Sequence, residues 1–199
     1  MRRLRRSFYE RDALVVAREL IGCLFVHRTS EGRLVVRLVE TEAYRGEQDP
    51  GSHGYRGMTP RTQVMFGPPG RLYVYFTYGM HWCANVVCGT KGTCEAVLLR
   101  AGEPVTGMEE MRRRRGGIPP RLVAAGPARL TQAMGITKEH NGASLVDEGA
   151  LFCAEDAITA RYRSSEIAET VRVGLARGRG EDLPWRFAVA DNPFTSRRR

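Results

Sequence analysis

The chain has 199 residues, 42% hydrophobic and 27% charged, which is enough for one well-buried core and excludes general disorder. Its formal net charge of +9 favours a polyanionic partner. However, Arg2, Arg3, Arg5, Arg6 and Arg197–Arg199 supply seven of these charges and leave two for the body. No segment is apolar enough for a membrane span or a signal sequence, so a cytoplasmic protein is expected.

The five cysteines do not form a metal-binding pattern. They are an odd set without a C-x-x-C pair, and the spacing of Cys83, Cys88 and Cys94 matches neither zinc nor ferredoxin ligands. They lie among strand-like apolar residues, where cysteine behaves as a small hydrophobe. We therefore expect no metal, no cofactor and a reducing compartment.

The first elements are a helix and a hairpin. Ser7 and Glu10 have capping-box spacing, an apolar period follows, and Gly22 is a plausible stop, which predicts a helix over 8–21. Two strands, 23–28 and 33–43, are then predicted on either side of the turn 29–32.

The second predicted strand ends in two acids. Its residues Leu34, Val36 and Leu38 share one face with Glu40 and Glu42. A glutamate at the edge of an apolar face can act as a general base that deprotonates a held water. A structural glutamate paired with arginine is the simpler interpretation, and spacing does not choose between Glu40 and Glu42.

The remaining elements follow a loop at 45–62. Loops of this length in a compact domain usually have a function. Strands are predicted at 71–78, 81–88 and 95–101, and a helix at 104–115. The run G-P-A-R-L predicts a second helix beginning near residue 126. Further strands are predicted at 151–154, 171–175 and 186–190. This order predicts one α+β domain on a mostly antiparallel sheet, covering 1–199 with short basic tails at about 1–6 and 195–199.

Aromatic residues accompany the acids. Tyr44 follows Glu42 by two positions, His53 lies in the loop, and Tyr73 and Tyr75 share a strand face, where at least one is expected in the core. An aromatic cavity beside a carboxylate suits a planar ring, since stacking contributes about 1–3 kcal/mol per base. Tyr78, at a glycine turn, is a candidate wedge between bases.

The sequence lacks the motifs of several familiar enzyme classes. It contains no G-x-S-x-G elbow, P-loop or dinucleotide fingerprint, and no zinc-deaminase signature. The two lysines, Lys91 and Lys138, lie outside the 39–85 cluster, whereas a Schiff-base mechanism needs an amine. Water is therefore the expected nucleophile.

Motifs in a fixed order cover almost the whole chain: V-E-T-E-A-Y (39–44), S-H (52–53), T-P-R (59–61), M-F-G-P-P-G (65–70) and L-Y-V-Y-F-T-Y-G-M-H (72–81). They continue through Asn85, V-L-L-R-A (97–101), G-P-A-R-L (126–130), V-R-V-G (171–174) and W-R-F (185–187). Together they resemble the alkyladenine DNA glycosylase family, the 3-methyladenine DNA glycosylases of base excision repair. The resemblance implies a curved antiparallel sheet flanked by helices.

The resemblance also implies the site. Glu42 would be the general base that activates water, which leaves Glu40 structural. Residues that stack on or border the flipped base would be Tyr44, His53, Tyr75 and Val173, and Asn85 would exclude the amino group of undamaged guanine. The DNA wedge and groove contacts would be Tyr78, Met80 and His81. Phosphate contacts would come from Arg100 and, as further candidates, from Arg56, Arg61 and Arg129.

The implied reaction is base removal without strand cleavage. Alkylated or deaminated purines (3-methyladenine, 7-methylguanine, ethenoadenine, hypoxanthine) would be flipped out of duplex DNA by a monomer, and water would cleave the glycosidic bond. The alternatives are a non-catalytic module that binds damaged DNA and a small-molecule nucleoside hydrolase. One departure is local: Gly51 and Gly54 flank Ser52-His53 where the family is expected to have alanines, which predicts a looser loop.

Overall fold

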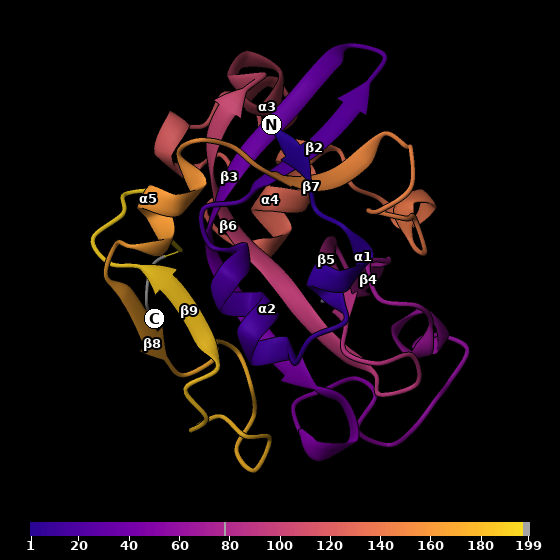
Figure 1. Cartoon of the computed structure of the whole chain (residues 1–199). Coiled ribbons are helices and arrows are strands. Elements are labelled where there is room, and N and C mark those ends of the chain that lie inside the picture. The colour runs from indigo at the N-terminus through magenta and orange to yellow at the C-terminus, as the bar shows by residue number, and fades with distance from the viewer. Residues whose placement is uncertain (78, 197–199) are drawn as a thin grey trace.

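The computed structural model describes residues 1–77 and 79–196. Within them, nine strands form one antiparallel sheet, ordered β1-β7-β2-β3-β6-β5-β4, with β8 and β9 joined through β9 to β3 (Figure 1). Their bounds are β1 Arg2–Arg3, β2 Leu24–Thr29, β3 Gly32–Arg45, β4 Leu72–Thr77, β5 His81–Cys88, β6 Glu95–Thr106, β7 Leu151–Glu155, β8 Ile167–Thr170 and β9 Arg186–Val189. The predicted α+β class with an antiparallel sheet is confirmed.

Five α-helices of the described residues flank the sheet: α1 Arg6–Tyr9, α2 Ala13–Leu20, α3 Met108–Arg114, α4 Pro127–Met134 and α5 Thr159–Arg163. The single helix predicted over 8–21 is wrong, because one helix ends at Tyr9 and a second begins at Ala13. Asp12 is the N-cap of α2, and its carboxylate accepts from the Leu14 amide at 2.8 Å. No described helix is long and apolar enough to cross a membrane.

Strand β3 is the centre of the sheet and has neighbours on both edges. It pairs with β6 along most of its length. Its residues Gly32 to Arg37 also pair with β2, and its residues Glu40 to Glu42 pair with β9. The hydroxyl of Thr41 donates to the Ala17 carbonyl of α2 at 2.9 Å, so that side of the strand faces α2. Glu40 and Glu42 alternate with Thr41 and lie on the opposite face, fully buried. The prediction that they share a face with Leu34, Val36 and Leu38 is wrong, because a bulge between Leu38 and Glu40 reverses the alternation.

The register places the important side chains in a row across four strands. Glu42 of β3 is opposite Leu98 of β6, Leu98 is opposite Asn85 of β5, and Asn85 is opposite Tyr73 of β4. Residues two positions away along each strand share the same face. Helix α4 packs against β5 and β6, so its first residues also approach this face.

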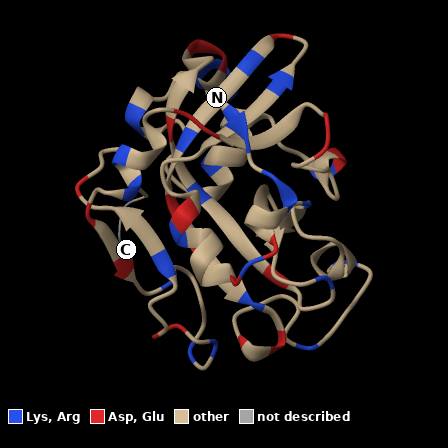
Figure 2. Ribbon diagram, viewed as in Figure 1, with Lys and Arg blue, Asp and Glu red and all other residues tan. Residues whose placement is uncertain are grey.

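Two further segments, one at 171–175 and one at the N-terminus, differ from the sequence predictions. The strand predicted at 171–175 is wrong; β8 is at Ile167–Thr170, and Arg172 and Val173 beyond it bond to the side chains of Asp49 and Glu42. The N-terminal arginines, expected as a tail, include β1, which pairs with β7. Basic residues are spread over many elements, including the end of α3 (Figure 2).

Candidate active site

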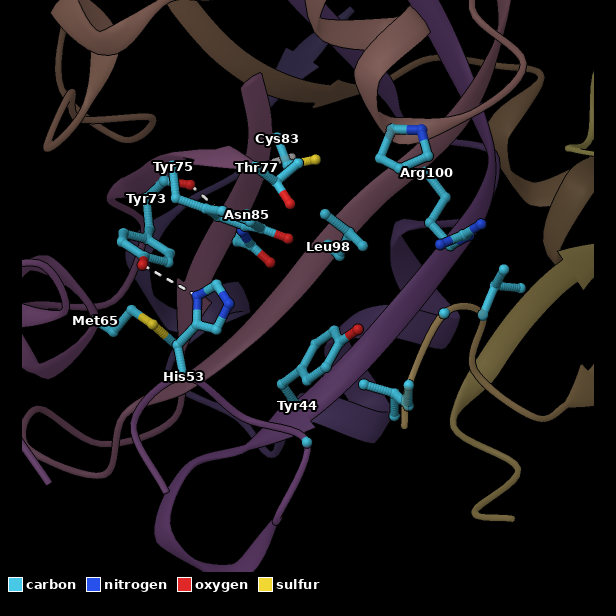
Figure 3. Close-up of a pocket in the computed structure, with 15 residues that line it drawn as sticks. Tyr44, His53, Met65, Tyr73, Tyr75, Thr77, Cys83, Asn85, Leu98 and Arg100 are labelled. Carbon is cyan, nitrogen blue, oxygen red and sulfur yellow. Dashed lines mark hydrogen bonds between the residues drawn. The ribbon is translucent and has the colours of Figure 1, made fainter. Parts of the chain in front are cut away.

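A cavity of about 210 Å³ opens on the face of the sheet opposite α2. This volume lies below the roughly 300–1,000 Å³ of pockets for drug-sized ligands and suits a smaller group such as one nucleobase. Figure 3 shows His53, Tyr73 and Tyr75 on one side and Tyr44 and Arg100 on the other. The lining is Tyr44, Gly51, His53, Met65, Tyr73, Tyr75, Thr77, Cys83, Asn85, Leu98, Arg100, Pro127, Val173, Gly174 and Leu175.

The Glu42 carboxylate lies directly behind this lining, with no exposed surface. Its Oε1 accepts from the Val173 amide at 2.7 Å and lies 3.2 Å from Nη1 of Arg100. Its Oε2 accepts from the Tyr44 hydroxyl at 3.0 Å. All three partners are donors and all three belong to residues that line the cavity, an arrangement that suits a carboxylate anion.

Glu40 is bound differently and does not line the cavity. Its Oε1 accepts from Nε of Arg100 at 2.9 Å and from Nε of Arg186 at 2.7 Å, and its Oε2 accepts from the Ser196 amide at 2.6 Å. Burial works to raise the pKa of Glu40, but the two guanidiniums and the Ser196 hydrogen bonds outweigh it and hold the pKa below its ordinary value. Glu40 is thus a buried anion committed to arginines and a backbone amide.

The aromatic side of the cavity is built from three rings. The His53 imidazole lies edge-on to Tyr75, with ring centroids 4.5 Å apart, and its Nδ1 is 3.1 Å from the Tyr73 hydroxyl. Tyr73 stacks on Tyr75 at 5.6 Å, and Tyr73 itself is buried, as expected for one of the pair. His53 is exposed as a residue, but its contacts with the tyrosines withdraw part of the ring from water. This desolvation, and then the Arg61 guanidinium, lower the pKa of His53 to about 4, so the ring is neutral at pH 7.

Tyr44 and Asn85 form other parts of the wall. Burial, and then the adjacent Glu42, raise the pKa of Tyr44 well above its ordinary value, so its hydroxyl stays protonated and able to donate. Asn85 is 5% exposed, and its amide donates to the Tyr73 carbonyl at 3.4 Å. That contact directs the rest of the Asn85 side chain towards the cavity, as Figure 3 shows.

A buried ion pair joins the two loops at the mouth of the cavity. Arg172 donates to both Asp49 oxygens, at 2.5 and 2.8 Å, and neither side chain is exposed. The same guanidinium donates to the Ala43 and Gly180 carbonyls and lies 4.7 Å from the Tyr44 ring centre. Because Arg172 precedes Val173 in the chain, this pair holds the Val173 amide at Glu42.

The two glycines beside His53 are close-packed. A Cβ on Gly54 would come within 1.9 Å of the Cys94 sulfur, and one on Gly51 would come within 2.8 Å of the Arg179 carbonyl. Cys94 is itself buried and has a positive φ of 58°. The expectation of a looser loop is therefore wrong: space filled by neighbours, rather than a need for flexibility, calls for glycine here.

The expected DNA contacts lie outside the cavity. Met80, which is 68% exposed, and His81 lie at the β4–β5 turn, whereas Tyr78 lies outside the described residues. Arg61 lies 5.6 Å from the Tyr75 ring centre, beside the cavity. Like Arg61, Arg56 and Arg129 are exposed. The structure thus brings together Glu42, Tyr44, His53, Tyr75, Asn85, Arg100 and Val173. It leaves at the surface Met80, His81, Arg56, Arg61 and Arg129.

Sequence reasoning did not single out every residue of the site. It missed the lining residues Met65, Thr77, Cys83 and Leu98 and the Arg172–Asp49 pair. Alternation signalled three of the four, because Thr77 shares a face with Tyr75, Cys83 with Asn85, and Leu98 with Arg100. No local signal marks Arg172 and Asp49 as partners.

In the described part of the chain, no three His, Cys, Asp or Glu side chains are grouped as a metal site requires.

Comparison with known proteins agrees with the geometry. A family model described as methylpurine-DNA glycosylase matches residues 7–193. A protein of Methanoculleus marisnigri is 50% identical over 96% of this chain and 97% of its own, and one of Carboxydothermus hydrogenoformans is 45% identical over 98% and 99%. Both have the provisional name 3-methyladenine DNA glycosylase. The predicted enzyme class, a DNA glycosylase of DNA repair, is confirmed, and the chain belongs to the methylpurine-DNA glycosylase family.

Proposed function

We propose that this protein is a monofunctional glycosylase that flips alkylated or deaminated purines out of duplex DNA and cleaves their glycosidic bond with water activated by Glu42. The candidate substrates are 3-methyladenine, 7-methylguanine, ethenoadenine and hypoxanthine. The relatives' names and the family support the class of reaction. The observation on which the mechanism rests is the position of the Glu42 carboxylate behind an aromatic cavity of about 210 Å³.

By a count of acceptor positions, Glu42 can accept one more hydrogen bond, which the proposal assigns to a water. A carboxylate has about four acceptor positions, and Arg100, Val173 and Tyr44 occupy three of them. A water in the fourth position would lie between Glu42 and a sugar whose base fills the cavity. In this proposal Glu42 takes a proton from that water, as a general base does.

The bonding changes are those of hydrolysis. The water oxygen bonds to C1′ of the sugar while the bond from C1′ to the base nitrogen breaks, and the bonding electron pair leaves with the purine. A base that is already cationic, such as 3-methyladenine or 7-methylguanine, departs neutral, whereas a neutral base such as ethenoadenine or hypoxanthine must take up a proton as it leaves. The products are the free base and an abasic site. The described cavity lining contains no lysine, which supports hydrolysis over a Schiff-base mechanism.

The aromatic wall suits electron-poor lesions. Tyr44, Tyr75 and His53 offer ring surfaces, and stacking contributes about 1–3 kcal/mol per base. A neutral His53, with a pKa of about 4, does not repel a cationic base. Extrusion of a base costs a few kcal/mol, least where damage has weakened its pairing, so flipping and stacking favour the same lesions.

The remaining residues have roles on the DNA. Tyr78, Met80 and His81 at the β4–β5 turn are proposed to fill the gap left by the flipped base and to contact the groove. Asn85 is proposed to meet the amino group of undamaged guanine and exclude it. Arg100 uses three of its five N–H groups on Glu40, Glu42 and Ser196, so two remain for the phosphodiester beside the lesion.

The test uses 3-methyladenine, ethenoadenine and hypoxanthine duplexes with enzyme in excess. Base release and alkali-sensitive abasic sites are followed for the wild type, Glu42→Gln, and the control Glu109→Gln, which changes an exposed α3 carboxylate. We expect Glu42→Gln to slow release by about 10²–10⁴-fold, the usual contribution of a general base. Duplex binding should persist and weaken steeply with salt in all three proteins.

Each alternative has its own outcome. Binding by the wild type without release of any lesion would indicate a damage-binding module. Unchanged release by Glu42→Gln would move the base elsewhere, with Glu40 tested next. Hydrolysis of free nucleosides at rates comparable to those on duplexes would favour a nucleoside hydrolase.

A further inference from the structure

A chain of polar contacts, partly buried at Ser196 and fully buried at Glu40, connects the C-terminal segment to the proposed base. Ser196 donates to Glu40 twice, from its amide at 2.6 Å and from its hydroxyl at 2.7 Å. Glu40 accepts from Arg100, and the Arg100 guanidinium extends to Glu42. Arg186 of β9 makes a second contact to the same Glu40 oxygen. The sequence separation between Ser196 and Glu40 is 156 residues, so only the folded chain brings them together.

The Arg100 guanidinium is divided between two acids. Its Nε lies 2.9 Å from Glu40, its Nη1 lies 3.2 Å from Glu42, and its Nη2 is 3.4 Å from the Ser196 hydroxyl. Arginine and carboxylate prefer a bidentate pair with two parallel hydrogen bonds. Arg100 does not form that pair with Glu42, because Glu40 and Ser196 hold the other edge of its fork.

We infer that Glu40 and Ser196, together the C-terminal latch, are positioning residues for the proposed reaction. The latch holds Arg100 where it makes one contact with Glu42. Without it, Arg100 is free to turn onto Glu42, form the bidentate pair and occupy the acceptor position required by water. This inference rests on the proposed function, because it assigns Glu40 and Ser196 a role only if Glu42 activates water.

The alternative is that the cluster contributes only to stability. Breaking any buried ion pair destabilises a fold, since it leaves an uncompensated charge. Arg37 and Asp156 supply a comparison: Arg37 is buried, as Arg100 is, but it is bound to a single, partly exposed carboxylate, through two contacts at 3.0 and 2.8 Å. Neither residue lines the cavity. The control Asp156→Asn therefore reports the effect of a broken arginine pair away from the site.

The experiment compares wild type, Glu40→Gln, Ser196→Ala and Asp156→Asn on one lesion duplex under single-turnover conditions, with affinity for a duplex containing an abasic-site analogue measured in parallel. We expect Glu40→Gln to slow release on the order of 100-fold, the cost of a misplacement of about 1 Å. Ser196→Ala should slow it roughly 2- to 10-fold, the effect of one ordinary hydrogen bond. Affinity should fall much less than the rate does, since Arg100 is the single proposed DNA contact that the change moves.

Double variants separate positioning from general destabilisation. If the latch acts through Glu42, Glu40→Gln causes no further loss of rate when it is added to Glu42→Gln. A full additional loss in that background would overturn the inference, as would an equal slowing in Asp156→Asn. If Glu40→Gln does not fold, Ser196→Ala is tested in the same cycle, and an unchanged rate for it overturns the inference. Release by the wild type and its slowing in Glu42→Gln test the proposed function, so the two failures are distinguishable.

Discussion

Two buried arginines lie beside the cavity and are used in different ways. Arg172 donates to both Asp49 oxygens and to two backbone carbonyls, and it does not line the cavity. Arg100 is divided between Glu40 and Glu42 and does line it. The first arrangement fixes two loops, and the Arg172 Nε is left buried without a partner among the described residues. The second holds Arg100 between two acids at the wall of the cavity.

The partner acids differ in the same way. Asp49 also accepts from the Gly51 and Arg45 amides of its own loop, so its oxygens are committed to structure. Glu42 has three donors, and all three belong to residues that line the cavity. Burial and an arginine partner are common to both acids, so they do not by themselves identify a catalytic acid. Whether the partners of the acid line a cavity is more informative.

The largest effect on stability is expected at the Arg172–Asp49 pair. Asp49→Asn leaves Arg172 buried without a counter-charge and should lower the free energy of unfolding by about 3–5 kcal/mol. Glu42→Gln should cost less, because Arg100 retains Glu40. Urea denaturation of both variants measures the difference. Equal losses would mean that the two arginines are not used differently.

A smaller effect on stability is expected from substitution of Gly54, the residue after His53 in the loop that contains Asp49. Gly54→Ala places a Cβ 1.9 Å from the Cys94 sulfur and should cost about 1–3 kcal/mol, the usual range for overpacking. Adding Cys94→Gly removes the clash and suits the positive φ at that position. Unfolding measurements should show recovery of most of the loss in the double variant. No recovery would mean that Gly54 is constrained by something other than Cys94.

The smallest effect concerns the pH dependence of lesion capture. Between about pH 5 and 7, where an ordinary histidine titrates, His53 stays neutral because its folded pKa is about 4. Affinity for a duplex with a cationic lesion should therefore show the same pH dependence in wild type and His53→Ala. An affinity that falls below pH 7 in wild type alone would show that His53 gains its proton in this range. By linkage, the lowered pKa disfavours folding as pH falls from about 6.5 towards 4, because the unfolded chain then binds the extra proton.

Much of the fold was predictable because its signals are local. Alternation and turn residues placed the hairpin strands β2–β3 and β4–β5 within one or two positions, since period 2 and a short turn specify a hairpin. Propensity failed at 171–175, where extended residues bond to Glu42 and Asp49 rather than to a strand. It failed again at residues 10–12, where the Asp12 cap restarts the helix.

The sequence by itself determined the family and the residue types at the site, because motifs are properties of short segments. Only the tertiary structure decided the face of β3 that bears the acids, through a bulge between Leu38 and Glu40. It also decided which acid has partners that line the cavity and which arginine serves which acid. Spacing left Glu40 and Glu42 equal, since both lie on one face. Their difference comes from Val173, Arg186 and Ser196, which are more than 130 residues away along the chain. Side-chain partners at that distance are specified by packing, which no local pattern encodes.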